Sequence, residues 1–386
     1  MDSHKGGSHD IWNRLSVYSL IAIAAASFWS TAAVEIASAC AVFGSALRLR
    51  NSREAIHQHL LLLVLWAAYL IAWITSVFAS PYKTEGFHSL LLFWHALLFP
   101  AILFTALTRR DITLVTTAML SSASVAAAAA IIHGLMGGTG LIAPQFVGVT
   151  TFANLAVLAV LVGLAVLLAH DLEDRTFSQP IFIAVGLAPV AISVFWSALK
   201  GPVIALVGGS LSLVSLLRPR ALIWWVCGLL LLFLSSPTVL LLKMEWLVSG
   251  GHLDRYALWR AGCSLLPELP LAGYGPGSFV RLLPAEASAA FTGKTPSTWH
   301  NDYLQTVLES GWQAGILYAA FLAVTGGRLL FQSHIRKRFS GTLTVLLVCF
   351  IFFSTIGSVL GSSILSVVWW CTLGLIVQLS QKDTPS

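Results

Sequence analysis

Charged side chains are scarce in this chain. They make up 10% of the 386 residues, whereas hydrophobic residues make up 57% and the mean hydropathy is +0.84. A soluble domain carries about a quarter charged residues, and so much apolar surface cannot be buried inside one soluble globule. The composition therefore predicts an all-α polytopic membrane protein. The net charge of +6 does not indicate nucleic-acid binding in such a chain, and we expect no nucleic-acid partner.

Cysteine is also scarce, and the chain lacks the short motifs of several enzyme classes. The five cysteines are scattered, form no CxxC pair and predict no disulfide framework. The eleven histidines are not spaced as ligand pairs, so no metal site is predicted. The sequence has no Walker A GK[ST] and no GxSxG, which argues against a nucleotide-binding loop and against a serine hydrolase.

Long apolar runs are abundant instead. A membrane-spanning helix needs roughly 20 apolar residues. The stretch 12–49 is too long for one helix and is predicted to hold two, with a break near Ser30 and Thr31. This pair and the single runs give about twelve spans. The single runs lie near 59–79, 87–108, 112–135, 149–170, 179–198, 200–217, 221–242, 311–332, 341–357 and 360–380.

The basic residues are distributed unevenly between the two sides of such a layout. Most of the 22 Lys and Arg residues fall on the side of the N-terminus, which the positive-inside rule assigns to the cytoplasm. Both termini are then cytoplasmic, and residues 243–310 form one large loop on the outer side. A transmembrane region of about nine helices at 1–242 precedes this loop, and one of about three helices at 311–386 follows it. The basic residues on the outer side are Lys83, Lys200, Lys243, Arg255, Arg260, Arg281 and Lys294.

The end of the outer loop, STWHNDYLQTVLESGW at 297–312, is polar for this chain. The run from Pro296 to Thr298 predicts a helix start with a hydroxyl cap, which puts His300 in the first turn. A helix N-terminus disfavours imidazolium, so a neutral His300 suits a general base near neutral pH; a capping or interfacial histidine is the alternative. Helical spacing puts His300, Leu304, Val307, Leu308 and Gly311 on one face, and Asp302, Gln305, Thr306 and Glu309 on the other.

The middle of the loop contains a predicted helix and a glycine-rich turn. The segment 253–266 has helical spacing and ends at Pro267 and Pro270. In GYGPGSF, at 273–279, three glycines predict a backbone turn. The amides of this turn either face an anion or close a tight bend.

Three basic residues on the outer side each have two interpretations. Arg255 and Arg260 either anchor the loop to lipid headgroups or clamp a phosphate with their guanidinium forks. Lys200 stands at the outer junction of two predicted spans. It is either a snorkelling lysine or another phosphate contact.

Two motifs in the loop resemble those of a known family. LDRYALWRAGCSLLPELPLAGYGPGSF, at 253–279, resembles the RxxxW and PxxGxGxGSF signature of the bacterial O-antigen ligase and polymerase superfamily. STWHNDYLQTVLESGWQAGILYAAFL, at 297–322, resembles the HNxYLxxxxExG motif of the same superfamily. The order of the motifs, the layout of about twelve spans and the large loop between the ninth and tenth helices also match.

The resemblance implies a GT-C-like glycosyltransferase architecture in the bacterial inner membrane, with the loop in the periplasm. It implies a metal-independent, inverting enzyme without a cofactor. The partners would be an undecaprenyl-diphosphate-linked O-antigen donor, a lipid A–core acceptor and membrane lipids. The family's base corresponds to His300, and its diphosphate-binding arginines to Arg255 and to Lys200, where lysine keeps the charge but loses the fork. Arg260 is a further diphosphate contact, and the supporting residues are Trp259, Asn301, Tyr303, Glu309, Gly275 and Gly277.

Other functions are compatible with the sequence. The nearest is a polysaccharide polymerase of the same superfamily, which would use the same donor and a carrier-linked glycan as acceptor. A secondary transporter is a different class, but transporters place ionisable groups at the membrane midplane. The predicted spans are almost free of charge, and Glu35, near the outer interface, is the main exception. A structural scaffold would explain the spans but not the arrangement of Arg255 and His300.

Overall fold

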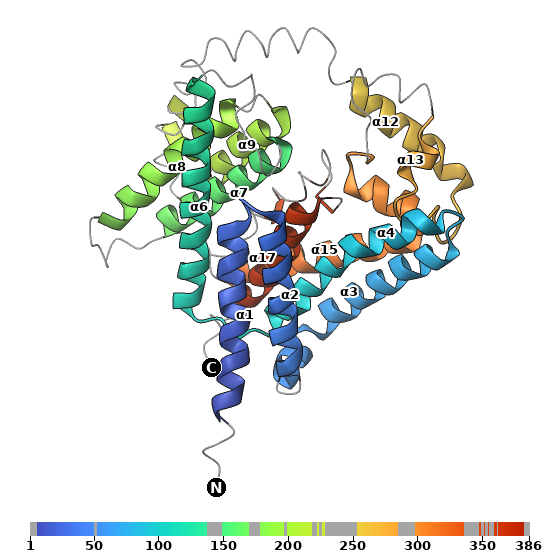
Figure 1. The fold of residues 1–386 in the computed structure, drawn as a ribbon, viewed down its shortest axis with the longest axis horizontal. Coiled ribbons are helices and arrows are strands. Elements are labelled where there is room, and N and C mark those ends of the chain that lie inside the picture. Colours follow the sequence, from blue (N-terminus) through green and yellow to red (C-terminus); the bar gives the residue numbers. More distant parts are fainter. Residues whose placement is uncertain are drawn as a thin grey trace.

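The computed structural model of the protein is built from helices and contains no strand in the part that it describes (Figure 1). That part comprises residues 6–49, 52–136, 149–169, 178–196, 199–217, 253–284, 298–335 and 362–381, with short pieces at 222–223, 226–227, 347–348, 351, 354 and 359–360. The all-α prediction is confirmed for these residues.

The helices follow the predicted apolar runs. In chain order they are α1 (Gly6–Ala26), α2 (Thr31–Arg48), α3 (Arg53–Ala79), α4 (Lys83–Phe93), the 3-10 helix η2 (Trp94–Leu97), α5 (Leu98–Leu103), α6 (Arg109–Leu135), α7 (Val149–Ala169), α8 (Ser178–Trp196), α9 (Lys200–Leu217), α12 (Leu253–Ser264), the 3-10 helix η5 (Leu266–Glu268), α13 (Phe279–Leu282), α15 (Asp302–Ile335) and α17 (Ser363–Gln381). In the part described, 5 helical stretches are long and apolar enough to cross a membrane: Thr31–Arg48, Arg53–Ala79, Lys83–Leu103, Arg110–Gly134 and Asp302–Phe331. The predicted spans 221–242 and 341–357 lie almost entirely outside the described residues, so the total of about twelve stays a prediction.

The predicted break within 12–49 is confirmed. α1 ends at Ala26, and α2 begins at Thr31. Ser30 caps the second helix: its backbone is extended, and its hydroxyl oxygen accepts a hydrogen bond from the Ala33 amide at 3.2 Å. A side-chain acceptor at this position satisfies one of the amides that a new helix leaves unpaired. α1 and α2 therefore fold back on each other as a hairpin.

Figure 1 shows the helices in two groups joined through α17. α1 packs against α2 and α6, α6 packs against α7 and α8, and α9 packs against α7 and α8. On the other side α3 packs along α15 and against α4, and α12 packs against α15. α17 packs against α2, η2 and α5, and also contacts α15. One hydrophobic core runs through both groups, so the arrangement of α3, α4, α15 and α17 relative to one another is set by apolar packing.

The ends of four helices meet at one end of the bundle. Arg48, the last residue of α2, donates hydrogen bonds to Asn13 Oδ1 and, at 3.0 Å, to the carbonyl of Phe104. Gln378 of α17 donates to the carbonyl of Thr105. The start of α1, the ends of α2 and α5, and the end of α17 therefore lie together. The sequence predicts both termini at this end.

α3 and α15 pack antiparallel. Ser76, near the end of α3, donates to the Ser310 hydroxyl near the start of α15 at 3.4 Å. Two turns earlier on α3, the ring of Tyr69 lies 5.2 Å from the ring of Tyr318, further along α15. The first turns of α15, which carry the polar segment, therefore meet the C-terminal end of α3.

The predicted span 87–108 is interrupted by η2, which contains a buried histidine. The side chain of His95 is fully buried, and its Nε2 lies 2.9 and 3.0 Å from the two carboxylate oxygens of Glu35 on α2. Beside it, the Ala96 carbonyl accepts a hydrogen bond from the Trp66 indole at 3.0 Å. An ionisable group among apolar helices needs a polar partner. Glu35, the main charged exception in the sequence, has that partner in His95.

Candidate functional site

The polar segment enters α15 differently from the sequence prediction. The helix begins at Asp302, and Asn301 caps it: Asn301 Oδ1 accepts a hydrogen bond from the Leu304 amide at 3.0 Å. The predicted start at Pro296–Thr298 was therefore wrong, because the asparagine side chain supplies the cap. His300 is not in the first turn but precedes the cap, with φ at 51°. This left-handed conformation is uncommon for a residue with a Cβ atom.

α15 is broken at Gly311, two turns after it begins. Gly311 has φ 81° and ψ 168°, a combination that essentially only glycine adopts. A Cβ atom at this position would lie 2.1 Å from the carbonyl oxygen of Leu271. The break ends the first piece of the helix, and the last carbonyls of a helix have no partner within it. Two of those carbonyls are satisfied by the glycine-rich turn.

The glycine-rich turn docks on this broken end. Gly273, Gly275 and Gly277 form the predicted backbone turn, and all three have positive φ. The Tyr274 amide donates to the Leu308 carbonyl at 2.8 Å, and the Gly275 amide donates to the Glu309 carbonyl at 2.9 Å. Of the two predicted roles, these amides therefore close a tight bend. The Gly277 amide is different, because it hydrogen-bonds to the carboxylate of Glu309.

A small second core holds the loop against α15. Trp299 is fully buried, packs edge to face on Phe279 at 4.8 Å between ring centroids, and contacts the same cluster as Leu308. Its carbonyl accepts a hydrogen bond from the Trp259 indole of α12 at 3.1 Å. Burial raises the pKa of the Tyr274 phenol at the edge of this cluster, so the hydroxyl stays a hydrogen-bond donor. These contacts join the segment with the RxxxW motif, at 253–279, to the segment with the HNxYLxxxxExG motif, at 297–322.

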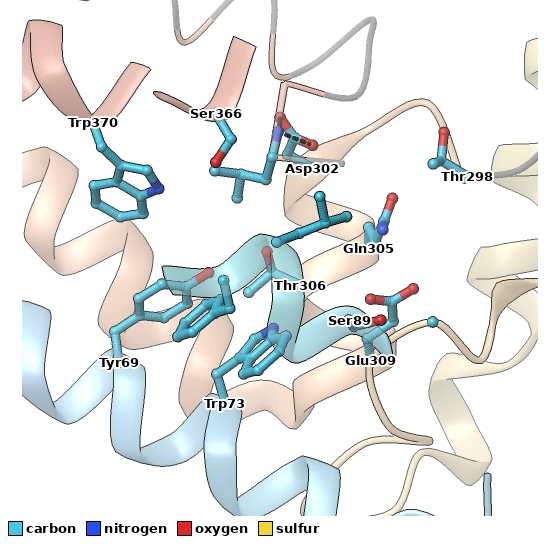
Figure 2. Close-up of a pocket in the computed structure, with 14 residues that line it drawn as sticks. Tyr69, Trp73, Ser89, Thr298, Asp302, Gln305, Thr306, Glu309, Ser366 and Trp370 are labelled. Atoms are coloured by element: carbon cyan, nitrogen blue, oxygen red, sulfur yellow. Dashed lines mark hydrogen bonds between the residues drawn. The ribbon is translucent and has the colours of Figure 1, made fainter. Parts of the chain in front are cut away.

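Beside the broken end lies a cavity of about 220 Å³ (Figure 2). All four polar residues predicted on one face of the helix line it: Asp302, Gln305, Thr306 and Glu309. That part of the prediction is confirmed. The rest of the lining comes from α3, α4, the glycine-rich turn, the polar segment and α17: Tyr69, Trp73, Ser89, Leu92, Phe93, Gly277, Thr298, Leu360, Ser366 and Trp370. Figure 2 shows the aromatic rings of Tyr69 and Trp73 on the side opposite Glu309 and Gln305.

The two carboxylates of the cavity differ in their surroundings. Asp302 is 1% exposed and accepts hydrogen bonds from the backbone amides of Val359, at 2.9 Å, and Leu360, at 3.3 Å. These bonds tie the start of α15 to the turn before α17. Glu309 is 6% exposed and bonds to the Gly277 amide and the Gln305 side chain, but its Oε1 atom has no hydrogen-bond partner. Asp302 therefore holds two segments together, whereas one carboxylate oxygen of Glu309 accepts no hydrogen bond from the described residues.

Two of the predicted site residues are sequence neighbours of residues that line this cavity. His300 stands between Thr298 and Asp302, both of which line it. Its amide lies 3.4 Å from the Thr298 hydroxyl oxygen, to which it donates a hydrogen bond. Tyr303, the next predicted residue, donates from its hydroxyl to the carbonyl of Ile351 at 3.3 Å. Tyr303 therefore holds α15 in place and has a supporting role.

The basic residues of the loop separate into different settings. Arg255 lies in the first turn of α12, four residues before Trp259 and about 6 Å from it along the helix. The Arg255 side chain itself lies outside what the structure describes. Arg260 is exposed on the same helix. Arg281 of α13 pairs with Glu85 of α4 at 2.8 Å, so this outer arginine has an ion-pair partner on the bundle.

Lys200 is a predicted site residue on a helix, α9, that is not among the described packing partners of α12 or α15, on or beside which the other predicted site residues lie. It begins α9, which packs against α7 and α8. Figure 1 shows α9 on the opposite side of the molecule from α12. The Lys200 side chain lies outside the described part, and its diphosphate contact stays a prediction.

The aromatic wall of the cavity was missed by the sequence analysis. Trp73 and Phe93 stack in parallel, with ring centroids 3.7 Å apart and planes 3° apart, and Trp370 adds a third ring. All of these residues lie within apolar runs. In such a run an aromatic residue is indistinguishable from one that only packs in the core. No signal in the sequence separates them.

Comparison with known proteins adds no family assignment. No protein-family model matches the chain, and no curated protein matches it significantly. The resemblance to the O-antigen ligase and polymerase superfamily therefore rests on the two loop motifs. These motifs contact each other through Trp259 and the carbonyl of Trp299.

Proposed function

We propose that the chain is a membrane glycosyltransferase of the O-antigen ligase type, acting at the periplasmic face. It moves a glycan from undecaprenyl diphosphate to a sugar hydroxyl of lipid A–core. The observation that carries the proposal is the contact between the two motifs. The Trp259 indole and the Trp299 carbonyl, 40 residues apart in sequence, are hydrogen-bonded, and the glycine-rich turn caps the broken end of α15. Motifs that act on one substrate must lie close together, and this contact supports the proposal for that reason.

The setting of His300 supports its assignment as the general base. It lies in a left-handed conformation just outside the helix, between two residues that line a polar cavity. Strained backbone of this kind costs about 1–3 kcal/mol and clusters at active sites. A histidine beside such a cavity can accept a proton near neutral pH.

The reaction requires one proton transfer and one displacement. His300 takes the proton from the acceptor hydroxyl as its oxygen attacks the anomeric carbon of the donor. The bond between that carbon and the diphosphate oxygen breaks, and the diphosphate leaves on its carrier with the bonding electrons. Arg255 stabilises the negative charge that develops there, with Arg260 and Lys200 as further cations. Inversion at the anomeric carbon follows from the single displacement.

Transfer by the purified protein tests the proposal. The protein in lipid nanodiscs is supplied with an undecaprenyl-diphosphate-linked glycan and lipid A–core, and the glycosylated acceptor is measured. His300→Ala is expected to lower the rate by about 10²–10⁴-fold, the usual contribution of a general base. His88→Ala is the matched control, because His88 is an exposed histidine of α4 that does not line the cavity.

The other outcomes separate the alternatives. If His300→Ala transfers glycan as fast as His88→Ala, the base assignment is wrong. If the wild type lengthens the carrier-linked glycan and leaves lipid A–core unchanged, the chain is a polymerase.

A secondary transporter is the second candidate, because the buried His95 and the half-buried Glu35 form an ionisable pair within predicted spans. In a transporter Glu35→Gln would abolish uptake into vesicles. In a glycosyltransferase the same variant keeps the chemical groups of the loop and is expected to retain transfer. Absence of both transfer and chain growth in the wild type would favour the transporter.

A further inference from the structure

The lining of the cavity contains two buried oxygen atoms that no described group of the protein satisfies. Glu309 Oε1 and Gln305 Oε1 are both inaccessible to solvent and have no hydrogen-bond partner. Both atoms accept hydrogen bonds and donate none. Buried polar atoms are nearly always paired, and an unpaired one calls for an explanation. What is missing from this part of the cavity is therefore a set of hydrogen-bond donors.

The charge of the lining restricts what can supply those donors. Its fourteen residues include two carboxylates and no lysine, arginine or histidine. A phosphate or a carboxylate would find no counter-ion among these residues. The described lining therefore favours an occupant without negative charge, and a sugar residue supplies several hydroxyl donors.

The opposite wall is suited to the apolar face of a sugar ring. Trp73 and Phe93 form a parallel stack, and Tyr69 and Trp370 extend the aromatic surface (Figure 2). Aromatic faces with a few placed polar groups are the usual composition of small-molecule sites. The volume of about 220 Å³ corresponds to about seven water molecules at ~30 Å³ each. It has room for one sugar residue and not for an oligosaccharide.

We propose that this cavity binds one uncharged sugar residue, whose hydroxyls donate to Glu309 Oε1 and Gln305 Oε1 once these side chains turn into the cavity, while its ring lies against the aromatic wall. The binding of a sugar in this cavity does not depend on the proposed function. Only the statement that this sugar is part of a substrate rests on the proposed function. The sugar is either the residue of lipid A–core that accepts the glycan or the first residue of the donor. In both cases it is bound next to Thr298, two residues from His300.

Binding of small sugars tests the cavity without requiring transfer. Methyl glucoside, methyl galactoside and methyl mannoside are titrated into the protein in nanodiscs and followed by saturation-transfer NMR. We expect at least one of them to bind to the wild type. Glu309→Met removes both acceptor oxygens at similar volume and is expected to weaken that binding at least about tenfold, the effect of losing one hydrogen bond to a charged group. Glu268→Gln, an exposed residue of the same loop, is the matched control and is expected to bind like the wild type.

The variant Glu309→Gln is a second test in case the Glu309→Met protein does not fold. It keeps the shape of the side chain and one acceptor, so weaker binding by a folded Glu309→Gln protein supports the proposal as well. Glucuronate and inorganic phosphate are not expected to displace the methyl glycosides, because the described lining carries no cation. Displacement by phosphate, or equal binding by Glu309→Met and the wild type, would overturn the proposal.

Transfer kinetics then identify the source of the sugar. A higher KM for lipid A–core in Glu309→Gln, with the KM for the donor unchanged, assigns the cavity to the acceptor; the reverse assigns it to the donor. If both KM values and glycoside binding stay at wild-type levels while His300→Ala abolishes transfer, the cavity proposal fails and the proposed function stands. If the wild type binds glycosides through Glu309 but transfers no glycan, the cavity proposal stands and the proposed function fails.

Discussion

The break at Gly311 can be tested with a single methyl group. Alanine at this position must adopt φ 81° and ψ 168°, which costs about 1–3 kcal/mol for a residue with a Cβ atom. Its Cβ would also lie 2.1 Å from the Leu271 carbonyl oxygen, far inside contact distance. Because the Leu271 oxygen belongs to the backbone, this clash cannot be relieved by rotating a side chain. We therefore expect Gly311→Ala to straighten α15 or to push the 271–275 segment away.

Either response breaks the docking of the glycine-rich turn. A straightened helix takes back the carbonyls of Leu308 and Glu309, which now accept from the Tyr274 and Gly275 amides at 2.8 and 2.9 Å. Two such hydrogen bonds contribute about 0.5–1.5 kcal/mol each. Together with the backbone strain, the expected cost is about 2–6 kcal/mol. The change also moves Glu309, and a displacement of ~1 Å at an active site can lower a rate about 10²-fold.

The matched control is Gly327→Ala in the same helix. Gly327 has helical geometry, and a Cβ atom there would meet nothing within 4 Å. Replacing such a glycine by alanine stabilises a helix by about 0.5–1 kcal/mol. We expect the melting temperature of the purified protein in detergent to fall for Gly311→Ala and to stay or rise for Gly327→Ala. If both variants melt and transfer alike, the break at Gly311 does not organise the site.

Two further predictions concern the contacts of the loop. Asp302→Asn keeps the shape of the side chain but weakens its hydrogen bonds to the Val359 and Leu360 amides before α17. We expect a lower melting temperature, equivalent to a loss of about 1.5–3 kcal/mol in the free energy of unfolding. An unchanged melting temperature would contradict the role of Asp302 as a tether. Arg281→Ala removes an exposed ion pair with Glu85. Such pairs contribute little, so we expect no measurable change in melting temperature, and a large drop would show that the pair is essential for folding of the loop.

Much of the local structure could be predicted from the sequence. The break before Thr31, the helix from Leu253, its end before Pro267 and the turn of Gly273 to Gly277 all depend on residues close together in the chain. Serine caps, prolines and glycines act on their own backbone, which is why their effects are visible in a sequence. The same local logic failed at His300, because Asn301 displaced the predicted cap.

The candidate site needed contacts between distant segments. The polar face of Asp302, Gln305, Thr306 and Glu309 followed from helical spacing, but the wall that it faces did not. Trp73, Phe93 and Trp370 lie in apolar runs on three other helices, and nothing in those runs distinguishes a cavity wall from a lipid contact. Lys200 is the converse case. The motif resemblance grouped it with the loop residues, whereas the described contacts of α9 are with α7 and α8.

The sequence by itself determined that this chain is helical and mostly apolar, and that its polar residues gather in one loop. Hydropathy, capping and glycine geometry are properties of neighbouring residues, which is why they can be read from the sequence. Only the tertiary structure decided that α15 breaks where the glycine-rich turn docks, and that Asp302 is saturated while Glu309 retains a free oxygen. Those outcomes depend on which amides and rings reach a carboxylate across the bundle. That is settled by the packing of α3, α4, α15 and α17 and not by any one of them.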